Sequence, residues 1–459
     1  MTVPDIRVRK LNQHPIREDG EFVLYWMIAN RRPGWNGSLD KAVEYAQAQQ
    51  KPLVILEALR SGYPWASDRL HHFILQGMRD NQRAFANSPV TYYPYVEERE
   101  GAGKGLLAAL SEKACVIVTD DFPAFVLPRM VTAAARKVQI RLEAVDSNGL
   151  YPMFATDRVF TVAHSFRRHL QKTLLPHLEW FPRANPFVGV DFPRLESMPA
   201  EILEHWPPAE LEYWTRGAEV LSSLPIDHSV SIVDSAPGGV VEAERRLQRF
   251  LKYRLPRYAE ERNEVEDEAA SGLSPYLHFG HLSTHQIFAA LVGGEEWTKE
   301  QVADKPNGKR YGWWGMSEAS ESFLDELVTW REIGFNMCSL CDDYDRYESL
   351  PEWARTTLTE HSNDRREYVY SLEEFERSRT HDELWNAAQR QLVREGKIHN
   401  YLRMLWGKKI LEWTSSPQEA LAVMIELNNK YALDGRDPNS YSGIFWVLGR
   451  YDRASGSAL

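Results

Sequence analysis

Two tryptophans and an arginine in the C-terminal third of the chain have the spacing that an electron path to a buried redox cofactor needs. Trp406 and Trp413 are seven residues apart, so one helix would carry both indoles on one face, about 10.5 Å apart along its axis. Arg403 lies one turn before Trp406 and can direct its guanidinium at Asp434, whose neighbour Gly435 marks a turn. A row of indoles ending at a polar turn indicates electron transfer, although each tryptophan taken singly is also explained as ordinary core.

A carboxylate and an indole share a helix face further upstream. Glu326 and Trp330 are four residues apart in a run with helical periodicity, so their side chains point the same way. The pair is a candidate site. Taken by itself, Glu326 is also explained as a surface acid on a half-apolar face.

A third candidate is the segment Ala270-Ser-Gly-Leu-Ser-Pro-Tyr276. Ser274 followed by Pro275 has the pattern of an N-cap and a first helical residue, so we expect a helix that opens at Tyr276. Small residues just before a helix N-terminus leave backbone N–H groups free for an anion such as a pyrophosphate. For these residues alone, a capped helix without a ligand is the alternative.

The cysteines indicate a reducing compartment and no metal site. There are three of them, an odd number that fits the cytoplasm better than a secreted disulfide framework. Cys338 and Cys341 have the CxxC spacing, but no second pair and no nearby histidine completes a zinc site. We expect buried helix positions for both.

Length and charge point to a water-soluble protein of two domains. The chain has 459 residues, and no apolar run approaches the roughly 20 residues that span a bilayer. The N-terminus has no apolar signal segment, so we expect a protein that is not exported: cytoplasmic, and associated with the nucleoid in a bacterium or nuclear in a eukaryote. We also expect a monomer. The net charge of -11 excludes nucleic-acid binding through bulk charge. Two segments nevertheless supply a local basic face. Residues 245–257 contain six basic residues and no acidic one, and residues 390–409 contain six basic residues and one acidic one.

The elements that must position these residues fall into three parts. Residues 1–146 alternate short apolar runs with amphipathic ones, which predicts a doubly wound α/β domain with a parallel sheet, although the GxGxxG of a dinucleotide site is absent. Residues 147–239 hold nine prolines between Pro176 and Pro237 and predict a wrapped linker with helical pieces at 163–174 and 208–221. Residues 240–459 show helical periodicity and predict an all-α domain. The expected strands are 22–28, 53–56, 90–93, 115–118 and 140–142, and the expected helices between them are 38–49, 68–85, 103–112 and 124–136.

Four motifs in order carry a resemblance to a known family. They are Leu384-Trp-Asn-Ala-Ala-Gln, Leu402-Arg-Met, Lys408-Lys-Ile-Leu-Glu-Trp and Leu433-Asp-Gly-Arg-Asp-Pro-Asn. No single motif is decisive, but their order and spacing together are highly specific. The chain resembles the class II cyclobutane pyrimidine dimer photolyases of the photolyase/cryptochrome family from about Phe22 to Arg453.

The resemblance implies a deoxyribodipyrimidine photo-lyase, a lyase that breaks carbon–carbon bonds. It would repair cyclobutane pyrimidine dimers in UV-damaged DNA with light, by electron transfer from excited reduced FAD to a flipped-out dimer. The helical domain would bind FAD, and the α/β domain can hold an antenna chromophore whose identity the residues do not give. The alternative is a cryptochrome-like flavin photoreceptor without repair activity.

The resemblance also assigns roles to residues. Glu326 would bridge the adenine of the flavin cofactor and the pyrimidine carbonyls, and Trp330 and Trp446 would stack on the flipped-out dimer and so bind DNA. Asn428 would stand near flavin N5. Trp385, Trp406 and Trp413 would carry electrons to the flavin from the surface. The expected cofactor-binding residues are Tyr258, Ser271, Gly272, Leu273, Ser274, Asn400, Arg403, Asn428, Asp434, Gly435 and Arg436.

The end of the chain departs from the family pattern. After Tyr451-Asp-Arg453 the sequence ends Ala-Ser-Gly-Ser-Ala-Leu459, whereas class II photolyases continue with a tail that contains Trp, Pro and basic residues. The ending resembles a truncation or an engineered scar more than a helix. We therefore expect altered packing behind Trp446 and an altered part of the DNA face.

Overall fold

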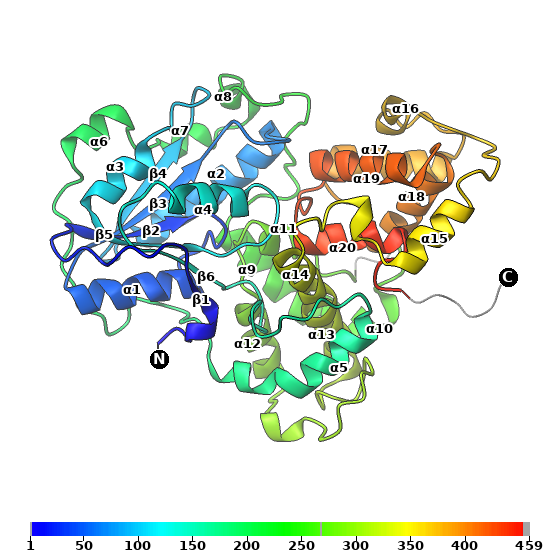
Figure 1. The fold of residues 1–459 in the computed structure, drawn as a ribbon, viewed down its shortest axis with the longest axis horizontal. Helices are drawn as coiled ribbons and strands as arrows, with labels where there is room; N and C mark the ends of the chain where they lie inside the picture. Colours follow the sequence, from blue (N-terminus) through cyan, green and yellow to red (C-terminus); the bar gives the residue numbers. More distant parts are fainter. Residues whose placement is uncertain (1, 267–268, 453–459) are drawn as a thin grey trace. The chain divides into compact units, whose positions relative to one another are not determined.

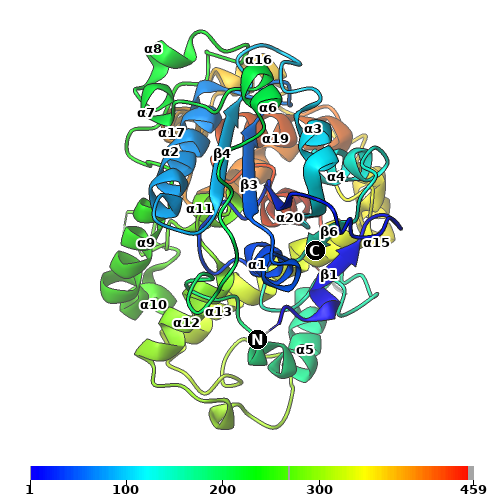
Figure 2. The same cartoon turned by 90° about the vertical axis from the view of Figure 1, so that its left-hand side faces the viewer.

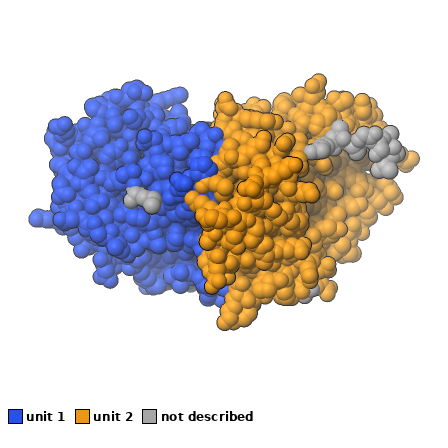
Figure 3. All heavy atoms as spheres, turned by 90° about the horizontal axis from the view of Figure 1, so that it is seen from below, with its two compact units in different colours: residues 1–155, 176–248, 273–290 blue, residues 156–175, 249–272, 291–459 orange. Residues whose placement is uncertain are grey.

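The computed structural model describes residues 2–266 and 269–452, so the departing C-terminal tail lies outside the described residues. The chain divides into two compact units, drawn in separate colours in Figure 3. Unit 1 comprises residues 1–155, 176–248 and 273–290, and unit 2 comprises residues 156–175, 249–272 and 291–459. The expected domain bounds 1–146, 147–239 and 240–459 stay a prediction.

Unit 1 is built on a six-stranded sheet in the order β1-β6-β5-β2-β3-β4. Only β1 runs antiparallel to its neighbour, and the other pairings are parallel, which confirms the expected doubly wound α/β fold. The sequence missed β1, because three residues with an exposed end carry no alternation to detect. The strands are β1 Val8–Lys10, β2 Phe22–Met27, β3 Leu53–Leu59, β4 Thr91–Val96, β5 Ala114–Asp120 and β6 Leu142–Val145.

Helices cover both faces of this sheet. Every residue of β2 and β5 is buried, as expected for parallel strands between two helical layers. Figure 2 shows α2 on one side of β3 and β4, with α3 and α4 on the other. The helices that connect the strands are α1 Gly37–Gln49, α2 Asp68–Phe85, α3 Leu106–Lys113 and α4 Leu127–Ala135. The other helices that begin in unit 1 are η1 Asp5–Arg7, α6 Ala200–His205, α7 Leu211–Trp214, α8 Ala218–Leu221, α9 Val240–Arg249, α11 Ser274–His278 and α12 Thr284–Gly294.

The helix expected at residues 208–221 is wrong as a single element. It is divided into α7 and α8 by Gly217, whose φ of 127° interrupts a right-handed helix.

A buried carboxylate fills the switch point of the sheet, where doubly wound folds commonly bind ligands. Asp120 ends β5, and its Oδ2 accepts the backbone N–H groups of Ile28, Ala29 and Asn30 at 2.9, 2.8 and 2.9 Å. Its Oδ1 accepts the hydroxyl of Tyr25 at 2.8 Å. The protein's own carboxylate therefore occupies the place that an anionic ligand would take, in keeping with the missing GxGxxG motif.

Among the described residues of unit 2 the named elements are all helices, joined by loops, which confirms the expected all-α part (Figure 1). No helix in the described part of the chain is both long enough and apolar enough to cross a membrane. The helices are α5 Ala163–Thr173, η3 Phe250–Arg254, η4 Leu255–Arg257, α10 Tyr258–Glu261, η5 Lys299–Gln301, α13 Glu318–Leu324, η6 Asp325–Trp330, α14 Arg331–Leu340, η7 Tyr347–Ser349, α15 Glu352–Glu360, α16 Leu372–Glu376, α17 Glu383–Glu395, α18 Asn400–Glu412, α19 Pro417–Tyr431 and α20 Pro438–Val447, with η2 Leu175–Glu179 at the boundary of the units.

Two glycines let helices of unit 2 cross α20 closely. A Cβ built on Gly334 of α14 would lie 2.6 Å from the carbonyl oxygen of Pro438. A Cβ built on Gly407 of α18 would lie 2.8 Å from the side chain of Val447. Any larger residue would push these helices apart, so the glycines fix the distance at which α14 and α18 pack against α20.

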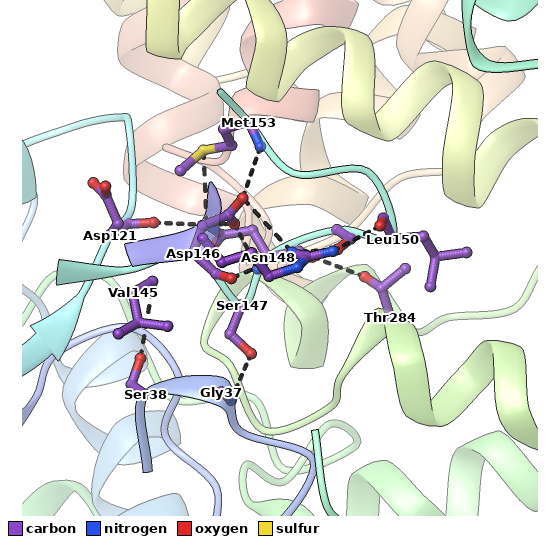
Figure 4. A network of polar contacts seen from close by, with 12 residues as sticks. Gly37, Ser38, Asp121, Val145, Asp146, Ser147, Asn148, Leu150, Met153 and Thr284 are labelled. Carbon is purple, nitrogen blue, oxygen red and sulfur yellow. Dashed lines mark hydrogen bonds and ion pairs between the residues drawn. The ribbon is translucent and has the colours of Figure 1, made fainter. Parts of the chain in front are cut away.

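A buried ion pair in unit 1 holds the turn that follows β6, and Figure 4 shows the hydrogen bonds that Asp146 accepts there from Asn148 and Met153. Arg7 and Asp146 are both 1% exposed at their side chains, with Nη1 and Oδ2 3.7 Å apart. Asp146 Oδ2 accepts the N–H of Met153 at 2.7 Å, and Arg7 donates to the carbonyl of Leu150 at 2.7 Å. Burial raises the pKa of Asp146, and the charge of Arg7 opposes that rise.

We expect Arg7→Leu to destabilise the fold by about 3–5 kcal/mol at pH 7, because it leaves a buried carboxylate without its cation. Without Arg7 the pKa of Asp146 rises further above its value in the unfolded chain. The folded variant then takes up a proton that the unfolded chain does not hold, so its stability falls as the pH rises. Chemical denaturation at pH 5 and pH 7 should show a larger loss at pH 7.

Arg9→Leu is the matched control, since Arg9 pairs with Asp121 at 2.7 Å but has a side chain that is 49% exposed. Its cost should stay below about 1 kcal/mol. Equal losses for the two variants, or a larger loss for Arg7→Leu at pH 5, would contradict the assignment.

Candidate active site

Glu326 and Trp330 both lie on η6, a π-helical turn between α13 and α14. Such turns are rare in helices and are frequent at functional sites. The side chain of Glu326 is 32% exposed and forms an ion pair with Arg262, and Trp330 is half-buried. A carboxylate and an indole are thus both open to a ligand on one short element.

Arg262 joins the predicted residues Tyr258 and Glu326. Tyr258 begins α10 and is buried against the rings of Phe250 and Phe323, at 5.7 and 5.5 Å between centroids. The guanidinium of Arg262 lies over the Tyr258 ring, 5.8 Å from its centroid. Burial lowers the pKa of Arg262, but the charge and hydrogen bond of Glu326 outweigh burial, so the pKa is raised overall. Sequence reasoning missed Arg262 because it stands in an acidic run; its four-residue spacing from Tyr258 was the available signal.

The ion pair expected between Arg403 and Asp434 is present and two-pronged. Arg403 donates from Nη2 to Oδ1 at 2.9 Å and from Nη1 to Oδ2 at 3.4 Å. The two side chains are 18% and 17% exposed, so the pair lies at the edge of the unit's interior. Asn400 is the first residue of the same helix, α18, and is exposed.

Asn428 lies near the end of α19 and is 2% exposed. Its Nδ2 donates to Ser440 Oγ at 2.8 Å and to Asn429 Oδ1 at 3.3 Å. Within the described residues no side-chain hydrogen bond reaches its Oδ1, which leaves a neutral acceptor for a ligand N–H. A neutral amide suits a ring nitrogen whose protonation changes, because a carboxylate there would repel a reduced flavin.

Gly435 and Arg436 shape the turn that follows α19. A Cβ on Gly435 would lie 2.7 Å from the carbonyl oxygen of Asn428, so only glycine allows this close approach. Arg436 has a φ of 66°, is 2% exposed, and donates its guanidinium to the carbonyl of Asn429, with longer bonds to those of Ala432 and Leu433. The arginine therefore caps the C-terminal carbonyls of α19.

The predicted phosphate-binding segment is divided along the chain, with Ser271 and Gly272 at the end of a unit 2 range and Leu273 and Ser274 at the start of a unit 1 range. The expected N-cap is wrong. The short helix α11 begins at Ser274, Leu273 is its N-cap, and no side-chain cap bond forms. Pro275 accounts for the shift, since its ring is accommodated anywhere in the first turn, where no intrahelical donor is needed. Gly272 has a φ of 68°, a conformation that favours glycine.

The three predicted electron-transfer tryptophans lie together in the interior of unit 2. Trp385, Trp406 and Trp413 are 4%, 3% and 2% exposed. The rings of Trp385 and Trp406 are stacked, with centroids 6.3 Å apart and planes 3° apart. Trp385 also meets Trp413 at 6.2 Å and 67°. α18 ends at Glu412 with Trp413 as its C-cap, and Trp385 on α17 contacts both other indoles. The spatial order is therefore 406, 385, 413.

The aromatic contacts continue from Trp413 toward the surface. His381, which is exposed, meets Trp413 edge-on at 4.9 Å, and Tyr370 meets it at 5.9 Å. The hydroxyl of Tyr370 and Nδ1 of His381 are 2.8 Å apart. The sequence did not indicate these two residues, since they lie on a loop and the N-terminal side of α17 with no periodic pattern.

Trp446 lies on α20 and is half-buried. The exposed Lys408 of α18 places its Nζ 5.3 Å from the centroid of this ring. A cation over an indole is favourable and leaves the ring partly accessible. Trp446 is thus available for stacking next to a positive charge.

The side chains of this part of unit 2 fit the flavin cofactor that the sequence implies. Arg403 and Arg262 supply cations for phosphates, and Asn428 supplies a buried amide with a spare acceptor. This combination of cations and a neutral amide fits a dinucleotide with a ring system that changes protonation.

We expect Arg436→Met to destabilise unit 2 by about 2 kcal/mol, because buried backbone carbonyls lose charged donors. The same loss should occur in flavin-free and flavin-containing protein, as measured by denaturant titration. Arg390→Met is the control, since that side chain is 56% exposed and its ion pair with Glu383 is long at 3.9 Å. A loss confined to flavin-containing protein would instead make Arg436 a ligand residue.

Comparisons with known proteins find similar chains that carry one name. The chain is 34% identical over 453 residues to a deoxyribodipyrimidine photo-lyase of Methanothermobacter thermautotrophicus, which covers 98% of this chain and 91% of that protein. It is 31% identical over 451 residues to a deoxyribodipyrimidine photo-lyase of Arabidopsis thaliana, and the alignment covers 97% of this chain and 85% of that protein. A solved bacterial class III photolyase from Agrobacterium tumefaciens shares the fold, with a TM-score of 0.66 over 94% of this chain and 80% of that chain at 17% identity. No protein-family model matches the chain.

Proposed function

The chain belongs to the deoxyribodipyrimidine photo-lyase family, and from this premise we propose that it repairs cyclobutane pyrimidine dimers in UV-damaged DNA with light. The observation that carries the proposal is the π turn that holds Glu326 and Trp330 within six residues, one accessible and charged, the other half-buried and aromatic. A flavin photoreceptor needs a cofactor and an electron path, but it needs no such substrate-facing pair.

We propose FAD as the cofactor, with Arg403, Asp434 and Asn428 as the residues that hold it. Tyr258 and residues 271–274 would contact its phosphates, together with Asn400 at the start of α18. The chemistry that bound, reduced FAD supplies is a light-driven transfer of one electron to the dimer and its return after the cyclobutane ring opens. Asn428 would accept a hydrogen bond from the reduced ring.

Trp330 and Trp446 would stack on the dimer. Photolyases as a class act on nucleotides taken out of the duplex, and a damaged, poorly stacked dimer costs less to extrude than a normal pair. Stacking on an aromatic side chain contributes roughly 1–3 kcal/mol per base. A protonated Glu326 would donate a hydrogen bond to a dimer carbonyl and so stabilise the negative charge that develops there.

The basic face that would dock the DNA backbone is smaller than the composition indicates. Arg245 and Arg246 both pair with Glu242 at 2.6 Å, so much of their charge is compensated within unit 1. In unit 2, Arg257 pairs with Glu261. We propose Arg249 and Lys252, together with Lys408 beside Trp446, as the phosphate contacts.

We further propose the class II type. Its support is the set of four motifs between residues 384 and 439. One motif contains Arg403, another contains its partner Asp434, and a third contains Trp385. The fold likeness to a class III photolyase has too little sequence identity to decide the type.

Illumination of the reduced protein with dimer-containing DNA tests the proposal. Product analysis should show that the dimers are converted to pyrimidines after blue light and remain unchanged in the dark. Heating the purified protein should release non-covalently bound flavin. Protein that binds flavin and responds to light but leaves every dimer intact would favour the photoreceptor instead.

We expect Glu326→Gln to keep flavin and damaged-DNA affinity but to lower the repair yield per absorbed photon by about tenfold. A hydrogen bond to a charged group is worth about 1.5–3 kcal/mol, and an amide N–H is a weaker donor to the dimer anion than a carboxyl O–H, so most of that stabilisation is lost. Glu318→Gln is the control, since Glu318 is an exposed acid at the start of the preceding helix. An unchanged yield in Glu326→Gln, measured with saturating damaged DNA, would remove Glu326 from the reaction.

A further inference from the structure

We propose that Gln389 is a positioning residue of the tryptophan path: its side-chain carbonyl orients the Trp406 indole and keeps this indole protonated while it is oxidised. The proposal rests on the proposed function, because it concerns how a flavin in this unit would be reduced. Gln389 is 0% exposed and lies on α17, one turn after Trp385. Its Oε1 accepts the indole N–H of Trp406 at 2.9 Å.

The same helix face supplies both partners of Trp406. Residues four apart on a helix are neighbours, so Trp385 stacks on the Trp406 ring while Gln389 holds its N–H. The indole N–H of Trp385 in turn donates to the backbone carbonyl of Trp406 at 3.1 Å. The two inner indoles are thus fixed against each other at both their faces and their edges.

Gln389 occupies this position although its amide is not fully satisfied. Its Nε2 is buried and has no hydrogen-bond partner among the described residues. A buried donor without an acceptor destabilises the fold, but an apolar side chain of similar length would leave the Trp406 N–H without its acceptor instead. The carbonyl end of this amide is the end that makes a bond, which indicates that the acceptor is what the position requires.

The nature of the acceptor decides what happens to the proton. One-electron oxidation makes an indole N–H strongly acidic, but an amide carbonyl is too weak a base to take the proton. When Trp406 gives one electron to the photoexcited oxidised flavin, its N–H therefore stays in place. Trp385 then returns one electron to Trp406, and its own N–H also ends on an amide carbonyl. Trp385 is refilled by one electron from Trp413, whose ring it contacts at 6.2 Å. Trp406 and Trp385 thus each lose one electron and regain one with no proton moved, and the oxidised site is left at Trp413.

The partial negative charge of the Gln389 carbonyl would also stabilise the positive charge on Trp406. Its surroundings differ from those of Trp413, where the exposed His381 ring lies 4.9 Å away and the Lys409 Nζ lies 5.3 Å from the indole centroid. A cation near the ring disfavours positive charge there, and loss of the indole proton would remove that charge. Deprotonation would therefore be more favourable at Trp413 than at Trp406.

The first test measures the hydrogen bond without any enzymatic activity. The protein as purified is labelled with ¹⁵N at tryptophan, and the Trp406 indole signal is assigned by its loss in Trp406→Phe. In Gln389→Met this N–H signal should move upfield. In Gln389→Glu, whose carboxylate is a stronger hydrogen-bond acceptor than an amide, it should move downfield.

The second test measures electron transfer. Light-driven flavin reduction with an external donor should be slowed about tenfold in Gln389→Met, the factor that one hydrogen bond to a charged group supplies. In Gln389→Glu the carboxylate is a strong enough base to take the indole proton, so neutral tryptophan radicals should replace protonated ones. Transient absorption should show protonated tryptophan radicals at early times in the wild type. Gln391→Met is the matched control, since this amide lies on the same helix and bonds to Glu395 at 3.2 Å.

Two results would overturn the proposal. An unmoved indole signal in Gln389→Met would show that the hydrogen bond does not form. A moved signal with wild-type photoreduction would show that the bond does not affect electron transfer. Repair by chemically reduced protein is measured separately, so a failure of the proposed function, with photoreduction intact, is distinguished from a failure of this inference.

Discussion

The helical unit depends on one constraint: an indole N–H buried in an apolar interior must find an acceptor. Trp385 satisfies it at the backbone carbonyl of Trp406, and Trp406 satisfies it at Gln389. These two bonds lock α17 to α18 and hold the indole planes within 3° of each other. The arrangement that completes the core is therefore also the arrangement that an electron path requires, because close parallel rings favour transfer between them.

The residues proposed to bind cofactor and substrate lie on the elements around this core. α18 carries both Trp406 and Arg403, so the helix that ends the indole row also supplies the ion pair with Asp434. Close crossings at Gly334 and Gly407 fix α14 and α18 against α20, the helix that bears Trp446. Arg262 connects Tyr258 to Glu326. In the proposed function, the supply of electrons and the binding of the dimer would therefore use different side chains on a shared scaffold.

Sequence patterns predicted the parts of this site that depend on spacing within one element or on turn chemistry. The parallel sheet followed from alternation, and the Arg403–Asp434 pair followed from a cation one turn from Trp406 and a glycine-marked turn. What the sequence could not supply were contacts between elements: the central place of Trp385, the role of Arg262, and the bond from Gln389. The start of α11 was misplaced because Ser-Pro fits more than one position of a first helical turn.

The central claim is that Trp385 links the inner and outer indoles and takes no part in repair itself. The most direct measurement compares Trp385→Phe with wild type in two assays, light-driven reduction of the oxidised flavin and repair yield per photon of the chemically reduced protein. Phenylalanine keeps an aromatic side chain of smaller size, so the fold should survive. The account predicts that photoreduction is lost while the repair yield stays at the wild-type value. Photoreduction at the wild-type rate, or repair lost in the reduced variant, would contradict it.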